Sequence, residues 1–374
     1  MAYGFNNVHD LVTKTADGRD LNHLFQEYAD LVAEYNAGRN ALIRFLSYEV
    51  TTPVINIGSF GAGVDFEEAS EYGEPKGIRP AAANIDRGVP FKWYDLSARF
   101  TWQYLVEASQ QDLDRITNTV LEASNRLYFR RMFTQLFRNT TQAFTLKGFE
   151  GGNGTGSTFT AFPFYNGDAE VPPPVGPTTF AAGHDHFNTN ASATLTPAML
   201  EALMTDVTEH GFNRANGYRL VVLVNEAQAN VIRSFRAGVN GATWDFIPAL
   251  GTNVILAPGT VVLGSQSSNE LDGLERLGTY GDWSIVVNAY MPAGYLFAFA
   301  TGGVNALNNP VAIRVHAREE LRGLRLVKGR NPDYPLIDSF YVNGLGTGVL
   351  ERGAGAVLQL GNAGAYTPPT DYAA

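Results

Sequence analysis

The most constraining feature of this 374-residue chain is a long stretch with an apolar stripe at helical spacing and neither proline nor glycine. It runs from residue 103 to residue 139. Its apolar positions are Leu105, Leu113, Ile116, Val120, Leu127, Phe133, Leu136 and Phe137. Apolar residues that recur every three or four positions predict an amphipathic helix. A helix of this length measures roughly 50 Å, so we expect it to cross more than one packed unit or to serve as a spine.

The segment before this helix divides into an arm and a ribbon. Residues 1–51 carry a second helical stripe, which Gly38 is expected to end, and residues 40–49 suit a further short helix. The arm's apolar positions are Leu21, Leu24, Phe25, Tyr28, Leu31, Val32 and Tyr35. Two strands, Val54–Ile57 and Val89–Tyr94, flank a stretch rich in Gly, Pro and Ala that has little to bury. A two-stranded ribbon is marginally stable alone, so we expect it to lie on another surface.

The second half of the chain reads as a turn-rich segment followed by an α/β pattern. Residues 147–195 are expected to be irregular. Thr196-Pro197 then opens a helix that ends near Gly211, and the apolar run 220–224 predicts a buried strand. A short helix is expected at 226–235. Further strands are expected at 253–256, 260–263, 284–287, 294–300, 311–315, 321–327, 339–342 and 356–360.

Composition excludes several classes of protein. Cysteine is absent, which excludes disulfides and thiolate metal sites and fits synthesis in a reducing cytoplasm. No apolar run approaches the roughly 20 residues that span a bilayer, and the first residues lack the pattern of a secretory signal. The net charge of −10 argues against a nucleic-acid binder that works through bulk charge.

Three histidines are the most tempting chemical site. His184 and His186 flank Asp185, and His210 follows later in the chain. Imidazole pairs of this kind can ligate zinc, but the sequence fixes neither a third ligand nor a general base beside them. We therefore interpret them as polar loop residues that form hydrogen bonds or fill an interface, with no metal and no cofactor expected. No nucleophile-elbow motif is present, and Gly152–Gly156 lacks the flanking strand and helix of a phosphate-binding loop.

Opposite charges gather on two separated parts of the chain. The ribbon stretch carries Asp65, Glu67, Glu68, Glu71 and Glu74 before its first basic residue, Lys76. A basic strip near the end carries Arg318, Arg322, Arg325, Lys328 and Arg330. If identical copies meet, the acidic part of one copy can lie against the basic strip of the next, which orients partners more than it adds affinity. Scattered, unpaired surface charges are the alternative interpretation.

The order of arm, ribbon, long helix, α/β unit and returning strands resembles the Hong Kong 97-like fold of tailed-phage major capsid proteins. Specific stretches carry the resemblance, particularly to the proteins of phages that infect actinobacteria. These stretches are Gly183-His184-Asp185-His186-Phe187, Thr196–Leu200, His210-Gly211-Phe212, Arg219–Asn225, Asn331–Tyr341 and Gly344–Gly348. Together they extend the resemblance over essentially the whole chain.

The resemblance implies an α+β fold with a defined domain order. It assigns an N-terminal arm to 1–51, an extended β-hairpin loop to 52–100, a peripheral domain with the spine helix 103–139 to 101–196, an axial domain to 197–310, and the return strands with a C-terminal tail to 311–374. It implies a non-enzymatic subunit of pentamers and hexamers in an icosahedral virion shell that encloses double-stranded DNA without sequence-specific binding. Gly58, Gly61, Gly63 and Gly88 are expected to be hinges of the ribbon.

The same resemblance bears on partners and alternatives. Only about fifty residues precede the ribbon, so a scaffolding protein is expected to be separate. A portal protein and a decoration protein are further candidate partners, and no membrane is expected. Lys76 and Asn331 lie in suitable regions for a covalent cross-link, but the local motif does not match and none is expected. The alternatives are an encapsulin-like protein compartment and, more distantly, a zinc-dependent hydrolase that uses His184, His186 and His210.

Overall fold

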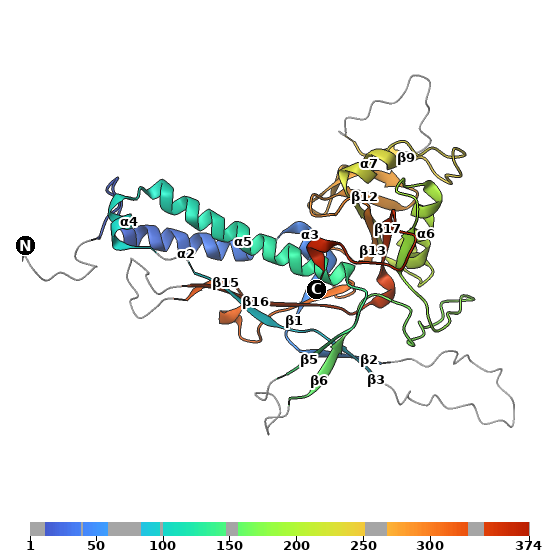
Figure 1. Cartoon of the computed structure of the whole chain (residues 1–374), viewed down its shortest axis with the longest axis horizontal. Helices are drawn as coiled ribbons and strands as arrows, with labels where there is room; N and C mark the ends of the chain where they lie inside the picture. Colours follow the sequence, from blue (N-terminus) through green and yellow to red (C-terminus); the bar gives the residue numbers. More distant parts are fainter. Residues whose placement is uncertain are drawn as a thin grey trace, which may run out of the picture.

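The computed structural model describes residues 12–38, 40–58, 84–97, 100–146, 156–250, 268–327 and 340–373. Figure 1 shows two long helices side by side at one end and a compact unit of strands and short helices at the other, with two narrow hairpins below. The mixture of helices and sheets agrees with the expected α+β class. Four 3₁₀ turns complete the described elements: η1 (Arg214–Asn216), η2 (Glu319–Leu321), η3 (Arg352–Ala354) and η4 (Thr370–Tyr372).

The predicted spine is two helices, α4 (Trp102–Glu107) and α5 (Gln110–Phe137). The prediction of one helix over 103–139 is therefore wrong at Ala108 and Ser109, where the backbone is extended. Ser109 Oγ accepts a hydrogen bond from the N–H of Asp112, and the Asp112 carboxylate accepts one from the N–H of Ser109. This capping box starts α5. Neither proline nor glycine marks the break, which explains why the periodicity missed it.

The cap at Ser109 gives a direct stability prediction. Replacing Ser109 by alanine removes the oxygen that accepts from Asp112 and should lower the free energy of unfolding by about 1 kcal/mol. Urea denaturation of the unassembled subunit measures this change. Ser109→Asn keeps a capping oxygen and should stay close to the original stability. An alanine variant as stable as the original chain would contradict the role of this cap.

The predicted helix of the arm is confirmed as α2 (Leu21–Ala37), which ends at Gly38. It lies along α5, where the Tyr28 hydroxyl donates a hydrogen bond to Asp114 at 2.8 Å. At its other end Asn36 exchanges two hydrogen bonds with the backbone of Leu324, at 2.8 and 2.9 Å. The expected second piece is α3 (Ala41–Leu46), which buries its apolar side chains in the main core. The described part of the arm thus packs on its own chain.

A first sheet lies beneath the long helix. Its strand order is β1 (Ser47–Val50), β14 (Val311–Arg314), β16 (Phe340–Val349) and β15 (Gly323–Val327), and β4 (Lys92–Leu96) also pairs with β16. α5 packs against β16, so that Met132, Phe133 and Leu136 share a core with Leu345 and Val349. The strands predicted around 311–315, 321–327 and 339–342 are confirmed here.

A second, eight-stranded sheet forms the compact unit. Its order is β10 (Glu270–Leu271), β11 (Leu274–Tyr280), β12 (Trp283–Val287), β8 (Arg219–Val224), β13 (Tyr295–Thr301), β17 (Gly355–Leu360) and β7 (Phe187–Asn190), and β9 (Phe246–Pro248) pairs with β11. The apolar run 220–224 is fully buried in β8, as predicted. β17 belongs to the segment 311–374, which is therefore divided between the two sheets.

Two helices cover the second sheet. α6 (Pro197–Thr208) begins with proline after the capping residue Thr196, as the sequence predicts, and packs against β13 and β17. α7 (Glu226–Ile232) packs against β12 and ends before the predicted limit at 235. The strands expected at 253–256 and 260–263 lie outside the described residues.

Two hairpins lie below the first sheet (Figure 1). β2 (Val54–Gly58) and β3 (Asn84–Gly88) form the described base of the predicted ribbon. The second ribbon strand expected at 89–94 is wrong, because β3 ends at Gly88 and residues 92–96 form β4 in the first sheet. Pro90 has no N–H to extend the ladder. The other hairpin, β5 (Gln142–Thr145) and β6 (Thr158–Ala161), lies against β3 and places a strand in the region 147–195 that was expected to be irregular.

Candidate functional site

The residues predicted to join neighbouring copies are only partly described. The five acidic residues at 65–74, Gly61 and Gly63 in the ribbon, Lys328 and Arg330 in the basic strip, and Lys76 and Asn331 all lie outside the described residues. Of the three described arginines of the strip, Arg318 and Arg322 flank η2 and Arg325 lies in β15. Arg318 is exposed, whereas Arg322 and Arg325 are half-buried.

The arginine strip is held by its own backbone. Arg322 donates to the carbonyl oxygens of His316 and Ala317 at 2.8 and 3.1 Å, and Arg325 donates to those of Arg322 and Glu319 at 3.1 and 2.9 Å. Within the described ranges, no ion pair ties these three arginines to a carboxylate, although the exposed Glu319 and Glu320 lie in the same turn. The guanidinium groups of Arg322 and Arg325 are thus bound to backbone carbonyl oxygens, and Arg318 is exposed beside two carboxylates.

The two described hinge candidates lie at opposite ends of the ribbon base. Gly58 pairs with Asn84, and Gly88 pairs with Val54. Gly88 is buried, and a Cβ at this position would lie 2.5 Å from the Phe144 ring and 2.7 Å from the Thr160 carbonyl oxygen. Glycine is thus required here for the close approach of the β5–β6 hairpin. Its role as a hinge stays a prediction.

The sequence did not predict a buried arginine network that lies at the base of the ribbon. Arg352 in η3 has no exposed side-chain surface. Its guanidinium lies 2.7 Å from Asp168 and 2.8 Å from Glu170, and it donates to the Pro163 carbonyl oxygen at 2.9 Å. Arg87 of β3 donates to the same Glu170 at 2.9 Å. Because Glu170 joins the two arginines, the network fastens the ribbon to the turn that leads into β17.

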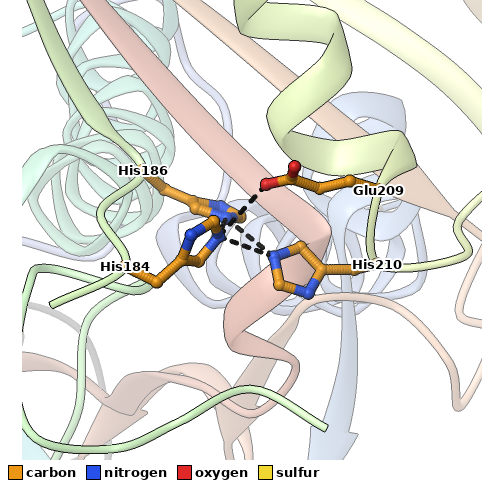
Figure 2. Close-up of side chains that lie close together, drawn as sticks. All are labelled: His184, His186, Glu209 and His210. Atoms are coloured by element: carbon orange, nitrogen blue, oxygen red, sulfur yellow. Dashed lines mark hydrogen bonds and ion pairs between the residues drawn. The ribbon is translucent and has the colours of Figure 1, made fainter. Parts of the chain in front are cut away.

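The fold also brings together a cluster of three histidines and one glutamate. His184 and His186 lie just before β7, and Glu209 and His210 follow the end of α6 (Figure 2). The three Nε2 atoms lie 2.9 Å (184–186), 3.0 Å (184–210) and 3.0 Å (186–210) apart. Glu209 Oε1 lies 3.2 Å from His184 Nε2. The fold therefore places two further candidate ligands, His210 and Glu209, beside the histidine pair, which the sequence alone did not fix.

The surroundings of the cluster keep two of its imidazoles, those of His186 and His210, neutral. Burial lowers the pKa of His186 to about 3 and that of His210 to about 4. The buried His186 donates from Nδ1 to the Gly355 carbonyl oxygen at 2.8 Å. Phe180 stacks on the His210 ring with centroids 4.4 Å apart.

Two of the neighbouring carboxylates have different roles. Asp185 accepts a hydrogen bond from the Phe187 N–H at 2.9 Å, so it shapes the turn and is not one of the four converging side chains. Glu209 was not singled out from the sequence, although its position directly before His210 was the available signal. The four side chains that can hold a metal ion are thus His184, His186, Glu209 and His210.

Comparisons with known proteins place this architecture. No protein-family model and no curated protein matches the chain. Among the described helices, none is long and apolar enough to cross a membrane. A solved structure from Mycobacterium phage Patience is 36% identical, with a TM-score of 0.74, and the match covers 100% of this chain and 97% of that chain.

More distant structures are also similar. One is the mature capsid of bacteriophage PhiM1, at 11% identity and a TM-score of 0.48, covering 87% of this chain and 89% of that chain. Another is a virus-like particle from Pyrococcus furiosus, at 10% identity and a TM-score of 0.41, covering 90% of this chain and 99% of that chain. These two similarities are too weak to support a conclusion.

The match to the Patience structure extends over the whole chain and so includes the stretches 183–187, 196–200 and 219–225, on which the resemblance in the sequence rests. The chain belongs to the family of tailed-phage major capsid proteins with the Hong Kong 97-like fold.

Proposed function

We propose that this protein assembles with identical copies into the pentamers and hexamers of an icosahedral phage head that encloses double-stranded DNA. The full-length similarity to the Mycobacterium phage structure carries the proposal. The net charge of −10 supports it, because a shell must enclose DNA without gripping it. The protein would be made in the cytoplasm of the host bacterium and end in the virion.

The proposed division of the chain follows the family. Residues 1–51 would be the arm, 52–100 the extended loop over a neighbouring subunit, 101–196 and 311–374 the peripheral domain with its tail, and 197–310 the axial domain around the symmetry axes. The network of Arg87, Glu170 and Arg352 supports the loop assignment, because it anchors the described base of the ribbon to its own subunit. Rings of identical subunits use head-to-tail contacts.

The proposed partners are copies of the same chain, a separate scaffolding protein, a portal and a decoration protein. Between copies, the acidic group at 65–74 would lie against the basic strip around Arg318. The exposed position of Arg318 supports this pairing. Electrostatic pairing of this kind fixes the orientation of partners.

Expression of the full chain tests the function. With a scaffolding protein supplied if needed, we expect shells of uniform size by negative-stain electron microscopy and a sedimentation coefficient far above that of the subunit. Particles isolated from phage-infected cells should hold nuclease-protected DNA. A subunit that stays monomeric under all these conditions would contradict the proposal. Particles that enclose a protein cargo in place of DNA would favour the encapsulin-like alternative.

A further inference from the structure

We propose that His184, His186, His210 and Glu209 form a binding site for one zinc ion in each subunit. Four ligand atoms, three imidazole nitrogens and one carboxylate oxygen, all lie within 4.8 Å of one another. Imidazole nitrogen with a carboxylate oxygen is a ligand set that zinc accepts in tetrahedral geometry. Magnesium and calcium prefer oxygen ligands, so the three nitrogens select against them.

Hydrogen bonding between the histidines does not account for their arrangement. His186 carries its proton on Nδ1, because the Gly355 carbonyl oxygen at 2.8 Å can only accept. Its Nε2 therefore presents a lone pair. His184 and His210 each have at most one proton on Nε2 to donate. The Nε2 atoms of these two residues also lie only 3.0 Å from each other. The three Nε2 atoms carry at most two protons, so they cannot form a hydrogen bond across each of the three short distances. A metal ion between them would accept a lone pair from each nitrogen.

The size of the cluster fits zinc. Zinc lies about 2.0–2.1 Å from imidazole nitrogen, which places tetrahedral ligands about 3.3 Å apart. The observed separations of 2.9 to 3.0 Å require the three nitrogens to move apart by only a few tenths of an ångström. Glu209 Oε1 lies 3.2 Å from His184 Nε2, near this spacing, and all four ligand atoms lie within 4.8 Å of one another, so the carboxylate has to close in on the other two histidines.

The surrounding residues orient the ligands in the manner of a metal site. Ligating histidines usually donate their other ring N–H to a carbonyl or carboxylate, and His186 does so toward Gly355. The His210 ring stacks on Phe180 and passes so close to Gly353 that a Cβ there would lie 2.8 Å from the ring. A pocket of about 480 Å³ is lined by His210, Phe180 and other residues, so it borders the His210 side of the cluster.

The ligand set indicates a structural ion. Catalytic zinc sites keep a coordination position open for water or substrate, whereas three histidines and one glutamate close a tetrahedron. The zinc-dependent hydrolase is therefore the weaker interpretation of these residues. Two ligands precede β7 at the edge of the sheet and two follow α6, so the ion would clamp this helix to the sheet edge. From the sequence we expected no metal, because the chain fixes no third ligand beside His184 and His186. The fold brings these two side chains together with Glu209 and His210, and the inference rests on that arrangement.

Metal analysis of the purified, untagged, full-length subunit tests the site without depending on assembly. We expect one zinc per chain by mass spectrometry, its removal by a chelator, and a rise in melting temperature when Zn²⁺ but not Mg²⁺ is restored. In a competition titration, Glu209→Gln and His184→Ala should each weaken zinc binding by at least about tenfold. The matched control is His23→Ala combined with His316→Ala, which removes two histidines outside the cluster and should leave affinity unchanged.

Three outcomes would overturn the zinc site. The first is a folded subunit, checked by circular dichroism, that binds no zinc after exposure to it. The second is zinc binding that the cluster variants leave unchanged, and the third is zinc lost equally in the control pair. If His184→Ala fails to fold, the partly exposed Glu209→Gln decides the result. The visible spectrum of tetrahedral Co²⁺, expected in the original chain and absent from the variants, supplies an independent readout.

Discussion

Replacing Arg352 by alanine should lower the free energy of unfolding by about 3–5 kcal/mol, as for other broken buried ion pairs. The side chain is fully buried and neutralises two carboxylates, Asp168 at 2.7 Å and Glu170 at 2.8 Å. Removing it also leaves the carbonyl oxygen of Pro163 without its donor. Because the two carboxylates are partly exposed, water can solvate them in part, and the lower end of the range is expected. Urea denaturation of the unassembled subunit measures the loss.

A matched arginine separates burial from charge in this experiment. Arg214 pairs with Asp282 at 3.3 Å, but both side chains are largely exposed. Its replacement by alanine should cost less than about 1 kcal/mol, as is usual for surface pairs. Arg352→Lys keeps the charge without the two-pronged hydrogen bonding and should fall between the two. Equal stability of Arg352→Ala and Arg214→Ala would contradict the structural role of the network.

The same network links stability to the ribbon. Glu170 also accepts from Arg87 on β3, so an Arg352 variant loosens the base of the ribbon as well as the turn before β17. Combining Arg352→Ala with Glu170→Gln should cost less than the sum of the single changes, because residues in one network are not additive.

Local patterns predicted the elements that one stretch of sequence specifies. The stripe at Leu21, Leu24 and Tyr28, the run at 220–224 and the Thr196-Pro197 start were sufficient for α2, β8 and α6. Each depends on burial of one face or on a cap within a few residues. The family resemblance then supplied the class of protein, which periodicity alone does not.

Features that depend on distant partners escaped the sequence. The second strand of the ribbon was misplaced, because residues 84–88 pair with β2 whereas residues 92–96 pair with the distant β16. One local feature was missed as well: the cap between Ser109 and Asp112 lies within a stripe that neither proline nor glycine interrupts. Arg352 meets Asp168 and Glu170 across more than 180 residues. His210 and its neighbour Glu209 reach the earlier histidines only because α6 packs on the sheet that β7 borders.

The charge pairing proposed between copies predicts the largest effect on assembly. One exposed ion pair contributes about 0.2–1 kcal/mol, which is negligible for folding. In the proposed shell each subunit would make such contacts with its neighbours, so a small loss of association free energy is repeated at every copy. A change of about 1.4 kcal/mol alters an association constant tenfold. The stretch that carries these charges is rich in Gly, Pro and Ala, so we expect its charges to change without loss of the core.

Reversing Glu67, Glu68 and Glu71 to lysine should therefore reduce the yield of particles at least about tenfold while the subunit stays folded. Sucrose-gradient sedimentation measures the yield, and circular dichroism measures the fold. The neutral Gln triple variant should lose less, because it removes attraction without adding repulsion. Adding Arg318→Glu to the lysine variant should restore part of the yield, since Arg318 is exposed whereas the other two described arginines of the strip are half-buried. A normal yield from the lysine variant, or no rescue by Arg318→Glu, would show that the ribbon finds its neighbour by contacts other than these charges.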